Sequence, residues 1–135
     1  MIVEALDHFV IYSGDSERTI AFYKNVLGLE IKFEDEWRAG KYPIFQIRLS
    51  PTQFINVHAA GKELHPRAQT AVPGGADFCF RTPLTPDEVV AHLAMHDVAI
   101  VEGPVRRSTA DGRPSMSVYF RDGDGNLVEL MSPTE

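Results

Sequence analysis

Four side chains of this sequence combine metal-binding chemistry with a regular placement. His8 and His58 occupy two apolar, β-rich segments of the first half, and Asp77 and Glu129 occupy two such segments of the second half. Each pair is separated by about 50 residues. Two imidazoles and two carboxylates suit Ni, Zn, Co, Mn or Fe(II), and suit the sulfur-preferring Cu(I) poorly. Taken alone, each residue is typical of an ordinary strand position; the matched spacing favours a metal site.

Side-chain alternation along these segments puts each candidate ligand on the face opposite to two bulky apolar residues. The apolar face of each segment is suited to packing beneath a helix. The opposite face then presents the polar groups on the uncovered side of a sheet. The apolar pairs are Phe9 and Ile11, Ile55 and Val57, Phe78 and Phe80, and Val128 and Leu130.

The segments fall into two halves that repeat the order β-α-β-β-β. In the first half, Asp15 or Ser16 is the expected N-cap of a helix that ends at Gly28. In the second half, Thr85 and Glu88 form a capping-box pattern at the start of the helix. The predicted helices cover residues 14–28 and 84–97, and the predicted strands cover 5–13, 29–35, 42–50, 53–60, 76–82, 98–103, 115–122 and 126–132.

The repeated order predicts an α+β fold of two βαβββ modules. Their strands would form a curved, mostly antiparallel sheet around a cleft, with the helices on the outer face. We expect a single domain over residues 1–135, with module one at about 4–60, a connection at 61–75 and module two at about 76–132. The connection is punctuated by proline and glycine and has no sustained periodicity.

The composition excludes several classes of function. A content of 44% hydrophobic and 24% charged residues is typical of a soluble globular protein. The net charge of −6 argues against non-specific nucleic-acid binding. No segment approaches the roughly 20 apolar residues that span a bilayer, and no basic segment precedes the first apolar run, so we expect no membrane partner and a cytoplasmic location. The lone cysteine, Cys79, excludes an intrachain disulfide and is expected to be structural.

Arginine side chains offer places for an anionic group of a small-molecule substrate. Arg48 lies in a predicted strand. Arg106, Arg107 and Arg113 lie in the basic stretch VRRSTADGR, for which a solvated loop is the simpler interpretation. A guanidinium forms paired hydrogen bonds with carboxylates and phosphates, so these four residues are the candidate substrate-binding cations.

Two motifs make the sequence similar to the vicinal oxygen chelate superfamily, which includes glyoxalase I, bleomycin-binding proteins and extradiol dioxygenases. LDHFVIYSGDSERTIAFYKNVLGLE resembles the opening strand and helix of that family, and YFRDGDGNLVEL resembles its closing hairpin. GKELHPRAQTAVPGGADFCF and EGPVRRSTADGRPSMSVYFRD resemble the glyoxalase domain-containing protein 5 group within it. The resemblance covers nearly the whole chain.

This resemblance implies paired modules around one divalent metal ion per site, usually in a homodimer. Carried over residue by residue, the ligand positions of the family fall on His8, His58, Asp77 and Glu129. Glyoxalase I commonly has glutamate or glutamine where His58 stands, and histidine where Asp77 stands. The set of two nitrogen and two oxygen donors is thereby kept.

The leading expectation is a metal-dependent, glyoxalase-type lyase or isomerase, similar to lactoylglutathione lyase, that acts on a small oxygen-bearing substrate. The metal ion would act as a Lewis acid on vicinal oxygens of the substrate, and Glu129 would move protons as a general base. One alternative is an Fe(II) extradiol-type dioxygenase that uses His8, His58 and Glu129. The other is a non-catalytic protein that binds a drug or metabolite.

Overall fold

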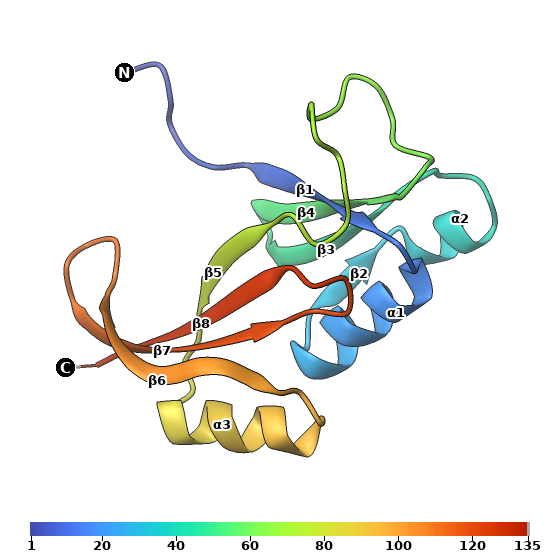
Figure 1. Cartoon of the computed structure of the whole chain (residues 1–135). Helices are drawn as coiled ribbons and strands as arrows, with labels where there is room; N and C mark the ends of the chain where they lie inside the picture. The colour runs from blue at the N-terminus through green and yellow to red at the C-terminus, as the bar shows by residue number, and fades with distance from the viewer. Residues whose placement is uncertain (135) are drawn as a thin grey trace. The chain divides into compact units, whose positions relative to one another are not determined.

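The computed structural model describes residues 1–134, which divide into two compact units, residues 1–75 and the part that begins at Ala76 (Figure 1). Each unit contains one four-stranded mixed sheet and its own helices. In each sheet, the strand that comes first in the chain pairs in parallel with the strand that comes last in the chain. The other pairings are antiparallel. The predicted α+β class with two repeated modules is therefore confirmed.

The first unit forms its helix where the capping pattern predicts one. Asp15 is the N-cap, and its carboxylate accepts a hydrogen bond from the Arg18 amide at 3.1 Å. The buried Ser13 and Thr19 hydroxyls lie 2.6 Å apart and join the end of the first strand to this helix. The elements are β1 (His8–Ser13), α1 (Ser16–Ala21), a π-helical turn η1 (Phe22–Val26), β2 (Glu30–Lys32), α2 (Glu34–Arg38), β3 (Phe45–Ser50) and β4 (Gln53–Ala59).

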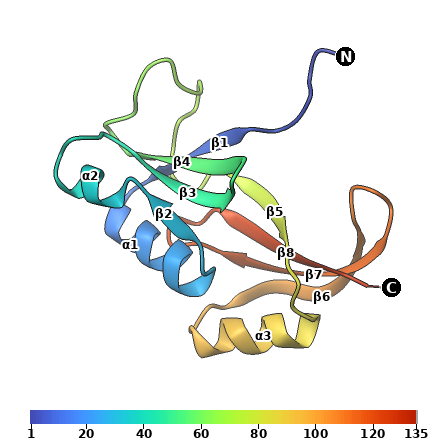
Figure 2. The same ribbon diagram turned by 180° about the vertical axis from the view of Figure 1, so that it is seen from behind.

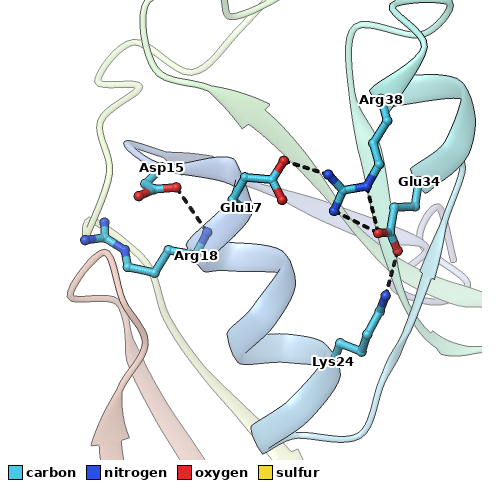
Figure 3. A network of polar contacts seen from close by, with 6 residues as sticks. All are labelled: Asp15, Glu17, Arg18, Lys24, Glu34 and Arg38. Atoms are coloured by element: carbon cyan, nitrogen blue, oxygen red, sulfur yellow. Dashed lines mark hydrogen bonds and ion pairs between the residues drawn. The ribbon is translucent and has the colours of Figure 1, made fainter.

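Helix α2 corrects the predicted strand 29–35, which ends at Lys32. Phe33 takes a left-handed conformation with φ 66°, and the chain then turns into a helix with acidic residues in its first turn. Glu34 accepts from Lys24 at 2.8 Å and from Arg38, four residues on, at 2.9 Å, and Arg38 also reaches Glu17 at 2.6 Å (Figure 3). These ion pairs tie α1, η1 and α2 together, a contribution that strand propensity did not anticipate.

The second unit begins its helix with the predicted capping box. Thr85 Oγ1 accepts from the Glu88 amide at 3.2 Å, and the Glu88 carboxylate accepts from the Thr85 amide at 3.0 Å. Val89 and Leu93 of this helix are buried, and the helix lies along one side of the sheet (Figure 1). The elements are β5 (Asp77–Arg81), α3 (Pro86–Met95), β6 (Ile100–Ser108), β7 (Pro114–Arg121) and β8 (Leu127–Pro133).

Strand β6 is longer than the predicted strand 98–103 and takes in part of the stretch interpreted as a loop. Arg106 and Arg107 pair with Met116 and Ser115 of β7, so the loop interpretation is wrong for these two arginines. A register shift between Glu102 and Val105 interrupts the pairing. Beyond this shift, β6 and β7 pair again and extend the hairpin.

The two sheets have the same strand order, β1-β4-β3-β2 and β5-β8-β7-β6. Helices cover one face of each sheet, as the view from behind also shows (Figure 2). None of the helices in residues 1–134 is long and apolar enough to cross a membrane. The core residues include Ile11, Ile20, Tyr23, Phe45, Ile47, Ile55 and Val57 in the first unit, and Val89, Leu93, Val118, Phe120 and Val128 in the second.

Candidate functional site

Strand registers confirm the predicted alternation in both sheets. In the first sheet, His8 lies opposite Phe54, and Tyr12 lies opposite His58. In-register residues share a face, so both histidines lie on the side away from the apolar residues that pack under α1. We call the side of each sheet that its main helix does not cover the open face.

His8 is held in a position that suits a metal ligand. Its Nδ1 lies 2.7 Å from Oδ1 of Asp7. Its ring stacks on Phe54 with the centroids 4.5 Å apart and the planes 7° apart, and Arg48 lies over the same phenyl ring at 5.1 Å. A carboxylate that accepts from Nδ1–H leaves Nε2 with a free lone pair, which is the arrangement of metal-bound histidines.

His58 has the opposite arrangement. It is 7% exposed, and its Nδ1 accepts a hydrogen bond from the Leu64 amide at 3.3 Å. Because Nδ1 accepts, the proton of the neutral ring lies on Nε2, and neither nitrogen offers a free lone pair. Burial lowers the pKa of His58, and the nearby Glu63 carboxylate opposes this shift. In this state His58 anchors the segment that follows β4.

A second anchor of that segment lies beside His58. The Tyr12 hydroxyl accepts from the Ala68 amide at 3.5 Å, and the Tyr12 and His58 rings meet edge to face at 5.8 Å. The predicted connection 61–75 is thus attached to the open face of the first sheet at two points. Neither contact follows a local sequence pattern, so this role was not predicted.

The first sheet also separates the two histidines along the strands. His8 begins β1, and His58 lies opposite Tyr12, four residues further along. Four residues of strand span about 13 Å. Ligands that lie about 2.0–2.1 Å from one ion are within roughly 4 Å of one another. The backbones of His8 and His58 are therefore well separated along the sheet, and their binding of one ion stays a prediction.

The second sheet presents both predicted carboxylates on its open face. Asp77 lies opposite Leu127, and Glu129 lies between Cys79 on β5 and Tyr119 on β7. Asp77 and Glu129 are therefore diagonal neighbours, a relation that spans about 7–8 Å. Partial burial, then the charge of Glu129, raises the pKa of the Cys79 thiol to about 11. Cys79 is exposed on this face and is not a core residue.

The repeat identifies a ligand candidate that sequence analysis missed. In the second sheet, Asp77 pairs with a residue of β8, and Glu129 lies two residues after that partner. In the first sheet, His8 pairs with a residue of β4, and Asn56 lies two residues after that partner. By register, Asn56 and not His58 is the counterpart of Glu129. Within residues 1–134, the buried Oδ1 of Asn56 has no hydrogen-bond partner. The sequence feature that could have identified Asn56 is side-chain alternation along the strand, since Asn56 shares the face of His58.

The four predicted arginines have different surroundings. Arg48 and Arg107 lie on the open faces of the first and second sheets. The Nε of Arg107 donates to the Tyr119 hydroxyl at 2.9 Å. Arg106 faces the opposite way, and Arg113 lies in the connection between β6 and β7. Among residues 1–134, no three His, Cys, Asp or Glu side chains stand as a ready-made metal cluster.

Comparison with known proteins identifies relatives over almost the full chain. Virulence protein STM3117 of Salmonella typhimurium is 38% identical over 131 residues, which is 96% of this chain and 85% of that protein. Its crystal structure matches with a TM-score of 0.86 at 36% identity and covers 99% of this chain and 100% of that one. Glyoxalase domain-containing protein RDO1 of Mycosarcoma maydis is 38% identical over 130 residues, 96% of this chain and 69% of that protein.

A more distant structure shares the fold alone. Lactoylglutathione lyase from Agrobacterium tumefaciens matches with a TM-score of 0.71 at 21% identity, covering 98% of this chain and 96% of that one. The family model described as the Glyoxalase/Bleomycin resistance protein/Dioxygenase superfamily matches residues 5–130. The predicted family resemblance is confirmed. The chain belongs to the glyoxalase/bleomycin resistance protein/dioxygenase superfamily.

Proposed function

We propose that this protein is a metal-dependent enzyme of the glyoxalase type, a lyase or isomerase that acts on a small oxygen-bearing substrate. The observation that carries the proposal is the state of His8. Its Nδ1 is engaged by Asp7 at 2.7 Å, its ring is fixed on Phe54, and its Nε2 is left to bind a cation. A histidine with one ring nitrogen engaged and the other available suits metal chemistry better than a structural role.

The proposed ligands are two from each unit, His8 with Asn56 and Asp77 with Glu129. Structural and catalytic metal sites use three or four protein ligands, so a coordination sphere needs both pairs, from one chain or from two. The sequence predicted His58 in place of Asn56. We favour Asn56 because it is the register counterpart of Glu129 and its Oδ1 is unpartnered, whereas Nδ1 of His58 is already used by Leu64.

A divalent ion bound there would supply a Lewis acid for neighbouring substrate oxygens. Of the chain's own groups, Glu129 is proposed to take a proton from the substrate, since this residue is in register with Cys79 and Tyr119 on the open face. Arg107, on the same face, is proposed to hold an anionic substrate group. Because the superfamily includes dimeric proteins, we also propose a homodimer, which light scattering on a sizing column would test.

Metal binding is the first test of this proposal. The purified chain is stripped with a chelator, reconstituted separately with Ni, Zn, Co, Mn and Fe(II), and measured by elemental analysis. We expect about one tightly held ion per chain, and losses of affinity of at least tenfold in His8→Ala and Glu129→Ala. His65→Ala, in the segment after β4, is the matched control and should bind normally. Failure of every metal to bind, or equal loss in the control, would contradict the proposal.

Turnover is the second test, and it separates reaction classes. Conversion of the hemithioacetal of methylglyoxal by the loaded wild-type protein, and not by Glu129→Ala, would support the isomerase proposal, and its absence would leave the substrate open. Oxygen consumption with a catechol in the presence of Fe(II) alone would replace the isomerase proposal with a dioxygenase. If the metal-free protein still binds a small molecule tightly and does not convert it, the protein would be a binding protein and not an enzyme.

A further inference from the structure

A row of hydroxyl groups lies on the open face of the second sheet beside Glu129. Ser115, Ser117 and Tyr119 alternate along β7 and therefore point to the same side. Ser115 is 1% exposed and Ser117 is 0% exposed. Within residues 1–134, neither serine hydroxyl has a hydrogen-bond partner. A buried hydroxyl without a partner is unfavourable, so the row carries unused hydrogen-bonding capacity.

Arg107 extends along this row from one end to the other. Its backbone lies opposite Ser115 in the β6–β7 register, and its Nε donates to the Tyr119 hydroxyl at 2.9 Å. The guanidinium also lies 5.4 Å from the centroid of the Tyr119 ring. The side chain therefore runs past Ser117, which stands between the two. Nη1 of Arg107 donates to the Arg106 carbonyl oxygen at 2.9 Å, so Nη2, which lies near a carboxylate of β6, is the guanidinium donor left for a ligand on this strip of the sheet.

The carboxylates that face this cation leave it only loosely neutralised. Glu102 on β6 approaches Nη2 of Arg107 at 3.5 Å, and the Glu102 side chain is 57% exposed. Glu129 lies one strand away, in register with Tyr119. A contact at 3.5 Å with an exposed partner is weak, so an incoming anion competes with it readily.

We propose that Arg107, Tyr119, Ser117 and Ser115 form a subsite for a carboxylate group. One carboxylate oxygen would accept from the guanidinium in place of Glu102, and the other would accept from the serine hydroxyls. The subsite adds a substrate-binding role to the proposed function, and its role in catalysis rests on that proposed function. It assigns the substrate to the carboxylic acids that carry a further oxygen group, which would lie toward Glu129.

Acetate is the probe, because it offers a carboxylate and no further oxygen group. Metal-free protein is titrated with sodium acetate at constant ionic strength, with sodium chloride as the salt control, and the backbone amide signals of Ser117 and Tyr119 are followed by NMR. We expect saturable shifts. The double variant Ser115→Ala, Ser117→Ala should bind acetate about tenfold more weakly. Arg107→Lys should also weaken binding, and Arg18→Lys, on α1 of the first unit, should not.

The melting temperature of the double variant separates a binding role from a structural one. Removing hydroxyls that have no partner should leave the melting temperature unchanged or raised, while acetate binding falls. No saturable shift in the wild type, or equal acetate affinity in the double variant, would overturn the proposal. A lowered melting temperature would overturn it too, because the hydroxyls would then have partners in the fold. Metal content, measured separately on the same variants, shows whether the proposed function stands.

Discussion

The two sheets have one strand order and one pattern of registers, yet their open faces carry different chemistry. On the first, aromatic contacts dominate: His8 lies on Phe54, with Arg48 over the same ring. On the second, polar groups dominate: Glu129 lies beside Cys79, and Arg107 is bonded to Tyr119. The repeat therefore fixes where a side chain can stand, and the residue type decides what it does there.

The proposed mixed ligand set depends on this difference. The first sheet would offer an imidazole nitrogen and an amide oxygen, and the second would offer carboxylates. The pairs occupy matching positions, because Asn56 is the register counterpart of Glu129 and His8 is that of Asp77. Substitutions at matched positions of the two sheets test whether the sheets are equivalent in stability and in metal binding.

The largest expected effect concerns the turns that precede the last strand of each sheet. Asn126, 1% exposed, donates from Nδ2 to Asp122 at 2.8 Å and accepts from the Ala76 amide at 3.0 Å, so it joins the turn to the start of β5. Its counterpart turn in the first unit relies on the half-buried Ser50, which accepts from the Thr52 amide at 3.2 Å. We expect Asn126→Ala to lower the free energy of unfolding by about 2–3 kcal/mol.

Ser50→Ala is the matched control and should change that free energy by less than about 0.5 kcal/mol. Urea denaturation followed by circular dichroism measures both. Equal losses of unfolding free energy would mean that the two turns contribute alike to stability, and the units would then not differ at these turns.

The next effect distinguishes the two candidate ligands of the first sheet. Asn56→Ala should weaken metal binding by about tenfold, as the loss of one ligand or its support does. His58→Asn keeps an oxygen acceptor near the position of Nδ1 but lacks Nε2, so we expect metal affinity within about threefold of the wild type. Isothermal titration with the preferred metal measures both. The reverse order would restore His58 as the ligand.

His58 variants also test the anchoring role by a separate measurement. His58→Ala removes the acceptor of the Leu64 amide, so that amide should exchange with solvent faster. His58→Asn should largely keep the protection. Equal exchange in the wild type and in His58→Ala would show that the 3.3 Å hydrogen bond is not what holds the segment.

A smaller effect is expected for the support of His8. Asp7→Ala removes the carboxylate that fixes the ring tautomer, and we expect metal affinity to fall by about three- to tenfold. Asp7→Asn, which keeps an acceptor oxygen, should lose less. Glu4→Ala, in the same N-terminal segment, is the charge control. If Glu4→Ala weakens binding as much as Asp7→Ala, the effect is long-range electrostatics and not support of the ring.

The smallest effect concerns α2, an element of the first unit with no counterpart between β6 and β7. The hydrogen bond from Lys24, followed by that from Arg38, lowers the pKa of Glu34 (Figure 3). A lowered folded-state pKa stabilises the fold above the ordinary glutamate range, and this stability disappears as the pH falls through the folded pKa. Glu34→Gln should therefore cost about 0.5–1 kcal/mol at neutral pH and less near pH 3.

Thermal unfolding of the wild type and Glu34→Gln across this pH range measures the difference. Asp35→Asn, in the same first turn, is the control for the helix dipole. A gap between wild type and Glu34→Gln that is constant with pH would mean that the ion pairs do not stabilise α2.

The sequence by itself determined the features that depend on local chemistry. Period-two alternation placed Asp77 and Glu129 on the face opposite their apolar neighbours, and the capping residues Asp15 and Thr85 located the two main helices. These signals are strong because each depends on the hydrogen bonds or side-chain directions of a few adjacent residues. The duplicated order of elements then predicted the fold class.

The tertiary structure decided what depends on pairing between distant segments. Alternation says which face a residue occupies, but not which residue lies across from it, so the distance between His8 and His58 and the match of Asn56 to Glu129 appeared only in the strand registers. The pairing of Arg107 with Ser115 required the extended β6–β7 hairpin, and α2 required ion pairs to Lys24 on a neighbouring element. A periodic sequence fixes the direction of a side chain; only the folded sheet fixes its neighbours.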